Sequence, residues 1–165
     1  MVVVDSSVLI PLSKIGKLEL IKDSFEKVIT TGYIYSEVVE EGKGRKGTSK
    51  IKDCFERWIE VKTVDRQMSE DIAELEGINI ADASLLILAE DTSSILLTND
   101  RALIMIAKTR NIEYYWLTTL ILKSTKEGRL ETVEGKAILG DLVDAGMNLK
   151  PQVYSRILKI LDDFI

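Results

Sequence analysis

The sequence contains no histidine, and this absence excludes more than any other feature of its composition. A Ser-His-Asp or Cys-His nucleophile, a His-ligated zinc site and an HExxH metalloprotease motif all need an imidazole. The 165 residues also include a single cysteine, Cys54, so neither an internal disulfide nor a cysteine-ligated zinc site can form. Any chemistry of this chain must therefore use carboxylates, hydroxyls, lysine or a hard metal ion.

Long apolar runs and excess positive charge are lacking as well. The longest uninterrupted apolar run, Ala102 to Ala107, is six residues, whereas a bilayer-spanning helix needs about 20. The first residues, Met-Val-Val-Val-Asp, form no basic leader, so we expect a cytoplasmic protein with no membrane partner. A net charge of -5 argues against a protein that coats nucleic acid by charge alone.

The remaining pattern is that of an α/β protein. Short apolar segments at 2–4, 28–31 and 95–98 are typical of buried strands, residues 58–64 alternate between apolar and polar like a strand, and 113–117 is the last predicted strand. Helical spacing separates these segments. This alternation predicts a central parallel sheet between two helical layers, a three-layer α/β/α fold. From Thr119 onwards all spacing is helical. We therefore expect a core domain over residues 1–117 and a C-terminal helical extension over 118–165 that packs on the same domain.

Acidic residues stand where this fold places ligand sites. Asp5 and Asp100 each end a predicted strand, and ligands of such sheets bind beyond the carboxyl ends of the strands. If the first and fourth strands are neighbours, these two side chains converge. Glu37 and Asp82 lie at or near the starts of predicted helices, where an acid also serves as an ordinary helix cap. Taken singly, each acid is equally consistent with a cap.

Four clustered carboxylates would need a counter-charge. Two unit charges 4 Å apart cost roughly 4 kcal/mol at an effective dielectric near 20. A divalent cation neutralises such a cluster, and all-oxygen ligation selects Mg²⁺ or Mn²⁺ over zinc. Carboxylate-held ions also activate water against a phosphodiester without a histidine base.

The ordered motifs resemble those of the PIN domain, the metal-dependent ribonuclease fold of VapC-type toxins and related RNA-processing factors. The opening segment from Asp5 to Ile21 is similar to a prokaryotic subgroup described as predicted nucleic-acid-binding PIN proteins, and so is the C-terminal segment, with Lys126-Glu-Gly-Arg-Leu and the stretch that begins Pro151-Gln-Val-Tyr-Ser. The matching segments are Val-Val-Asp5-Ser-Ser, Tyr-Ser-Glu37-Val, Ala-Asp82-Ala-Ser-Leu and Leu-Thr-Asn-Asp100-Arg-Ala-Leu.

The resemblance implies a role for each matching residue. Asp5, Glu37, Asp82 and Asp100 would be the catalytic residues and the ligands of one or two Mg²⁺ or Mn²⁺ ions. Ser6 and Thr98 would orient these ligands from a second layer of hydrogen bonds. Such toxins often carry a further acid where this chain has Ala102, so a second ion would have one ligand fewer. Glu40 and Glu41, which follow Glu37, are expected to be solvated charges.

The same resemblance implies an Mg²⁺- or Mn²⁺-dependent endoribonuclease with RNA as substrate, a small antitoxin protein as partner and a homodimer formed through helices. Arg101 would contact RNA phosphates, and so would the basic loop at Lys43, Arg45 and Lys46. An ordinary solvated loop explains these three cations equally well. We expect the aromatic run Tyr114 to Trp116 to be part of the core rather than a base-stacking platform.

Other function classes fit the sequence less well. A haloacid-dehalogenase-type phosphatase needs a second Asp where this chain has Ser7, and a dinucleotide-binding fold needs glycines after the first strand. A response-regulator receiver needs an acidic pair that the chain does not offer after its first strand. The main alternative is a catalytically silent PIN-fold protein that binds nucleic acid or acts as a scaffold.

Overall fold

The computed structural model describes residues 1–164, and its centre is a sheet of five parallel strands. The strand order is β3-β2-β1-β4-β5, so β1 lies between β2 and β4. The predicted adjacency of the first and fourth strands is therefore confirmed. The strands are β1 (Val2–Val4), β2 (Val28–Thr31), β3 (Ile59–Lys62), β4 (Ile95–Leu97) and β5 (Tyr114–Tyr115).

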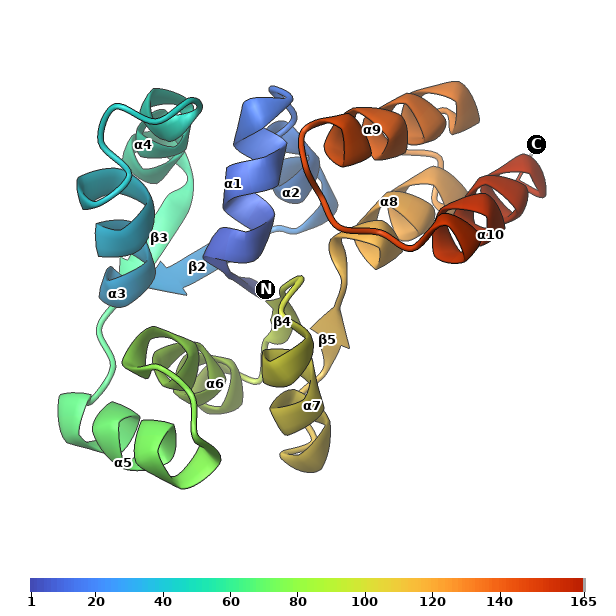
Figure 1. Cartoon of the computed structure of the whole chain (residues 1–165). Coiled ribbons are helices and arrows are strands. Elements are labelled where there is room, and N and C mark those ends of the chain that lie inside the picture. Colours follow the sequence, from blue (N-terminus) through green and yellow to red (C-terminus); the bar gives the residue numbers. More distant parts are fainter. Residues whose placement is uncertain (165) are drawn as a thin grey trace.

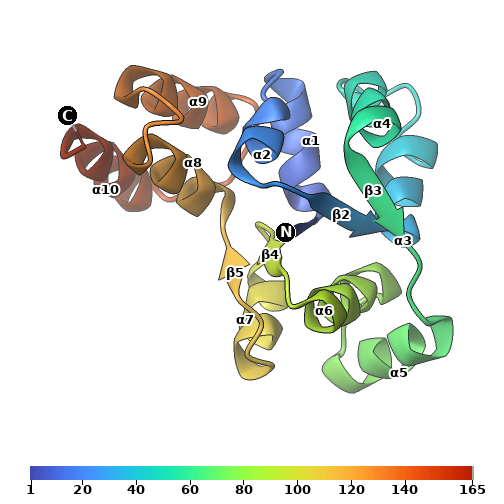
Figure 2. The ribbon, with the colours of Figure 1, turned by 180° about the vertical axis from the view of Figure 1, so that it is seen from behind.

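Helices cover both faces of the sheet, which confirms the three-layer α/β/α fold (Figure 1). The connections that lead from β1 to β3 lie on one face, and those that lead from β3 to β5 lie on the other (Figure 2). The first group is α1 (Ser6–Lys14), α2 (Glu19–Ser24), α3 (Gly32–Tyr35), a π-helix η1 (Ser36–Glu40) and α4 (Thr48–Arg57). The second group is α5 (Arg66–Glu76), α6 (Ile80–Thr92) and α7 (Arg101–Thr109).

Strand burial follows position in the sheet. Every residue of the central strands β1 and β2 is buried, in keeping with their continuous β-branched composition. The edge strand β3 alternates less regularly and exposes its middle residues, and β5 is only half-buried. Helix α6 packs on β1, β2 and β4, and its segment 83–89 is buried on all sides. An apolar stretch without a polar face is what such a central helix needs.

Three helices follow β5: α8 (Leu117–Lys126), α9 (Thr132–Asp144) and α10 (Pro151–Asp162). Their apolar side chains join the same hydrophobic core as the sheet. Polar contacts tie them to the first helical layer, including a 2.9 Å hydrogen bond between the hydroxyls of Ser24 and Ser124 and a 3.0 Å ion pair between Lys17 and Glu134. The extension thus packs on the core domain, and the division at residue 117 stays a prediction.

Two helices are irregular. Helix α3 continues directly into the π-helix η1, so the hydrogen-bond pattern changes within the helical segment that carries Glu37. Pro11 lies in the interior of α1. Proline lacks the N–H that would bind the carbonyl of Ser7 one turn earlier. The side-chain amide of Asn99 donates to that carbonyl instead, at 3.3 Å, so the interior proline leaves no unpaired group at this point.

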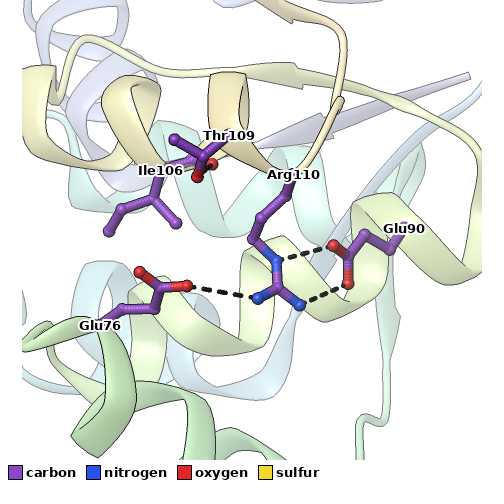
Figure 3. Close-up of polar contacts among 5 residues, drawn as sticks. All are labelled: Glu76, Glu90, Ile106, Thr109 and Arg110. Atoms are coloured by element: carbon purple, nitrogen blue, oxygen red, sulfur yellow. Dashed lines mark hydrogen bonds and ion pairs between the residues drawn. The ribbon is translucent and has the colours of Figure 1, made fainter.

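Arg110, just after α7, joins the three helices of the second face (Figure 3). Its guanidinium donates to both carboxylate oxygens of Glu90 on α6, at 2.7 and 3.0 Å, and to Glu76 on α5 at 3.3 Å. All three side chains are partly shielded from solvent. No helix within residues 1–164 has the length and apolar character that crossing a membrane requires.

Candidate functional site

Asp5 follows β1 directly and is the most buried of the four predicted ligands, with 3% of its surface exposed. It holds the N-cap position of α1, yet its side chain does not cap the helix. Its carboxylate accepts three hydroxyl hydrogen bonds instead, from Ser7 at 2.6 Å, Thr98 at 2.7 Å and Ser6 at 3.3 Å. The helix-cap interpretation therefore does not apply to this residue, whose orientation is set by neutral donors from α1 and the end of β4.

Ser6 joins Asp5 to Glu37. Its hydroxyl also lies 3.0 Å from a carboxylate oxygen of Glu37, which is on the π-helical turn η1. In that turn the N–H of Glu41 donates to the carbonyl of Ser36, five residues earlier. Single π-turns of this kind are frequent at functional sites. Burial raises the pKa of Glu37, and the negative charges of Asp5 and Glu41 raise it further against the lowering effect of Ser6.

Asp82 lies in the first turn of α6, and the cap of that helix is Asn79 rather than Asp82. Asn79 accepts from the backbone N–H of Asp82 at 2.7 Å and donates to its carboxylate at 3.0 Å. Burial raises the pKa of Asp82 to about 7, and the charges of Asp5, Asp100 and Glu37 each contribute to the rise. The fold thus brings all four acids into one electrostatic neighbourhood at the carboxyl edge of the sheet.

Asp100 is the one acid of the four whose side chain caps a helix in the expected way. Its carboxylate accepts from the N–H of Leu103 at 3.0 Å, at the start of α7. Its own N–H donates to the hydroxyl of Thr98 at 3.0 Å, and that hydroxyl in turn donates to Asp5. Asp100 therefore caps α7 and is linked to Asp5 through Thr98 at the same time.

Sequence reasoning missed two residues of this network, Ser7 and Asn99. The Ser7 hydroxyl donates to Asp5 and accepts from the backbone N–H of Asn99 at 2.8 Å. The Asn99 side chain donates to the Ser7 carbonyl and accepts from the N–H of Leu117 at 3.0 Å, at the start of α8. The signal that was available is Pro11, because an interior proline frees the carbonyl four residues earlier for an outside donor.

The predicted phosphate-binding cations lie in two places. Arg101 is exposed and directly follows Asp100 at the start of α7. Lys43, Arg45 and Lys46 are also exposed, but their loop packs at the far end of α1, where Gly47 abuts Ser13. Since α1 has nine residues, this loop is removed from Asp5 by about 13 Å along the helix. Their role in binding RNA stays a prediction.

A hard divalent cation fits the donor chemistry of the four acids. All four offer carboxylate oxygens, and within residues 1–164 none of them forms an ion pair with a lysine or arginine. A buried carboxylate without a cationic partner is costly. In their present positions, no three His, Cys, Asp or Glu side chains of the described residues are gathered closely enough to hold one ion.

Comparison with known proteins found a matching family model and a similar fold. A family model described as a PIN domain, DUF3368, matches residues 1–163. No curated protein matches the sequence. Among solved structures, the fold is similar to that of PAE2754 from Pyrobaculum aerophilum, with a TM-score of 0.56 and 21% sequence identity over 74% of this chain and 94% of that chain. At this identity the likeness concerns the fold alone.

Proposed function

The chain belongs to the PIN domain family, and from this premise we propose that it is a metal-dependent endoribonuclease. PIN domains are generally nucleases and usually use divalent metals. The proposed catalytic residues and metal ligands are Asp5, Glu37, Asp82 and Asp100. The observation that carries the proposal is the hydrogen-bond network that joins three of these acids, because Ser6 contacts both Asp5 and Glu37 and Thr98 contacts both Asp5 and Asp100.

The proposed ion is Mg²⁺ or Mn²⁺, one or two per chain, because the available ligands are all carboxylates. When bound, such an ion supplies an activated water and stabilises the departing oxygen of a phosphodiester. The role of the surrounding protein residues is to orient the carboxylates toward this ion. Hydroxyls of Ser6 and Thr98 orient Asp5, and Ser6 keeps Glu37 beside it.

RNA is the proposed substrate in spite of the net charge of -5. Each divalent ion adds two positive charges, so two ions would change the net charge to -1. Arg101 then offers a cation immediately beside the acids, and Lys43, Arg45 and Lys46 offer more cations at the other end of α1. A strand that crosses the site along α1 would meet both groups.

From the resemblance to VapC-type toxins we also propose a cellular role. We place the protein in the cytoplasm as the toxin of a toxin-antitoxin pair, silenced by a small antitoxin and acting as a homodimer. Induced expression in a bacterial host should then arrest growth, and Asp5→Asn should relieve the arrest. Sedimentation equilibrium tests the dimer directly, since a mass of one chain would exclude it.

Cleavage of a mixed pool of structured and single-stranded RNA in Mn²⁺ tests the enzyme. Wild-type protein should cleave the pool, and Asp5→Asn should reduce the rate by at least about a hundredfold while the circular dichroism spectrum stays unchanged. Asp91→Asn is the matched control, because Asp91 is an exposed acid at the opposite end of the helix that carries Asp82. Equal cleavage by wild type and Asp5→Asn would contradict the assignment. A parallel DNA pool tests the preference for RNA.

The alternative function, a catalytically silent PIN-fold protein that binds nucleic acid or acts as a scaffold, is favoured by one observation. The described residues do not gather three acidic side chains around a single point, and Asp100 already caps α7. This alternative predicts that the protein binds RNA, shows no thermal shift with Mn²⁺ and leaves the RNA pool intact. A metal-dependent cleavage that Asp5→Asn abolishes would exclude it.

A further inference from the structure

A cavity of about 650 Å³ opens beside the acidic site. It lies between α1, the turn that joins β4 to α7, the start of α8 and the segment 147–150 that joins α9 to α10. In Figure 1 that segment runs from α9 past the start of α1 toward α10. Ser7 and Asn99, which belong to the hydrogen-bond network around Asp5, also line the cavity. The cavity and the acids are thus built on shared residues.

The lining combines an apolar wall with positive charge. Trp116, Pro11 and Leu149 are half-buried and supply apolar surface, whereas Arg101 and Lys150 are exposed and supply two cations. No Asp or Glu lines the cavity. Within residues 1–164 neither cation forms an ion pair, so both remain available to an anionic ligand. Trp116 was expected in the core as part of the last strand, but β5 ends at Tyr115.

The segment 147–150 contacts Asn99 through Met147. The side-chain amide of Asn99 lies 3.8 Å from the sulfur of Met147, and the backbone N–H of Asn99 donates to Ser7. The C-terminal extension therefore supplies one wall of a cavity whose other wall belongs to the core domain. The cavity volume lies within the range of small-molecule sites, about 300–1,000 Å³.

We propose that this cavity binds the nucleotide next to the cleaved phosphodiester of single-stranded RNA, with Trp116 stacking on the base and Arg101 and Lys150 contacting phosphates. The inference rests on the proposed function, which places the cleaved phosphodiester at the four acids. The charge of the lining favours an anionic ligand. An RNA strand bound to the four acids through a divalent ion would meet Arg101 and Lys150 at the cavity, and neither cation has an ion-pair partner among the described residues. An aromatic side chain with flanking cations is the arrangement that single-stranded nucleic acid requires.

Tryptophan fluorescence tests the inference without measuring cleavage. The chain has two tryptophans, so Trp58→Phe leaves Trp116 as the sole emitter, and Asp5→Asn keeps the RNA intact. A single-stranded oligoribonucleotide about eight nucleotides long, added in Mg²⁺, should quench Trp116. An abasic oligonucleotide of equal length and charge should quench it much less. Saturable RNA binding that leaves the emission of Trp116 unchanged would overturn the proposal.

Substitutions then separate base stacking from charge. In RNA binding measured by anisotropy, Trp116→Leu should weaken affinity about 5- to 100-fold, and Trp116→Phe should restore most of it. Lys150→Gln should weaken affinity several-fold and reduce the slope of log affinity against log salt by about one. Lys159→Gln is the matched control, because Lys159 is an exposed lysine of α10 that does not line the cavity.

The outcomes distinguish this inference from the proposed function. Quenching of Trp116 by RNA together with an intact RNA pool in Mn²⁺ would support the cavity and refute the nuclease. Cleavage with unchanged KM and kcat in Trp116→Leu would support the nuclease and refute the cavity. If Trp116→Leu alters the sedimentation mass and leaves RNA affinity unchanged, the cavity is a contact between protein chains and the proposal is wrong.

Discussion

Asp5 illustrates how single residues prepare the site. A carboxylate with 3% exposure loses its hydration, and in this chain three hydroxyls replace that hydration without adding positive charge. These neutral donors orient the carboxylate but leave it without a cationic partner. The pKa of Asp82 rises to about 7 because Asp82 is buried and lies near three other acids. A bound divalent cation would remove both costs.

The pKa of Asp82 predicts a pH-dependent stability of the metal-free protein. Because the folded pKa, about 7, lies above the ordinary value of 3.8, the folded state holds this proton more tightly. The stability that the proton contributes is present at low pH and is lost as pH rises through about 7. Asp82→Asn should therefore raise the unfolding free energy in chelator at pH 8 by about 1–3 kcal/mol, allowing for partial exposure, and should change it little near pH 4.

Urea denaturation of both proteins at the two pH values measures this effect. Asp91→Asn, on the same helix but exposed, should behave as wild type at both. If Asp82→Asn instead lowered the unfolding free energy at pH 8, the prediction would be wrong, because the other acids would then not destabilise the charged form of Asp82.

At the scale of secondary structure, the geometry of a helical turn determines where an acidic side chain lies. Glu37 lies in the π-turn η1, which ends at Glu40, two residues before Gly42. A Cβ at Gly42 would lie 2.5 Å from the carbonyl oxygen of Val38, which is within that turn. Glycine at this position is therefore a condition for the wide turn, and the turn in turn places Glu37 beside Ser6.

Gly42→Ala should force η1 away from this contact. We expect a loss of unfolding free energy of about 1–3 kcal/mol and weaker Mn²⁺ binding, because Glu37 moves with its turn. Calorimetric titration and chemical denaturation measure the two effects. The control is Gly32→Ala, because a Cβ at Gly32 meets no heavy atom within 4 Å. Equal Mn²⁺ affinity in the two variants would show that the turn does not position the ligand.

The Arg110 cluster of Figure 3 stabilises the second helical face rather than the site. Arg110→Ala should lower the unfolding free energy by about 1–3 kcal/mol, because two partly shielded carboxylates lose a guanidinium that binds one of them at two atoms. Arg66→Ala removes an exposed pair with Glu70 and should cost less than about 0.5 kcal/mol. Denaturant midpoints measure both. An effect on RNA cleavage beyond that of Arg66→Ala would give Arg110 another role.

For the whole molecule, the proposed metal site predicts that stability depends on divalent cations. Ligands that bind only the folded state raise its stability, and a cluster of repelling carboxylates gains further from the counter-charge. Millimolar Mn²⁺ or Mg²⁺ should therefore raise Tm by several degrees, and chelator should reverse the shift. Asp5→Asn should shift less than wild type, and Asp91→Asn should shift equally. The same Tm with and without Mn²⁺ would contradict the metal site.

The sequence by itself determined the strands, most helices and the chemical character of the site. Continuous β-branched segments are buried, periodic segments are helical, and the absence of histidine leaves carboxylates as the available ligands. These properties are local in the chain. They also identified Asp5, Glu37, Asp82 and Asp100 as candidates, which the fold then brings into one electrostatic neighbourhood.

Only the tertiary structure decided which elements meet. The position of β1 between β2 and β4 brings Thr98 to Asp5, and the path of the segment 147–150 brings Met147 to Asn99. It also turned the expected helix around Glu37 into a π-turn and moved Trp116 from the core to a cavity wall. The physical reason is that periodicity encodes which face of an element is buried, whereas contacts between residues far apart in the chain depend on which element covers that face.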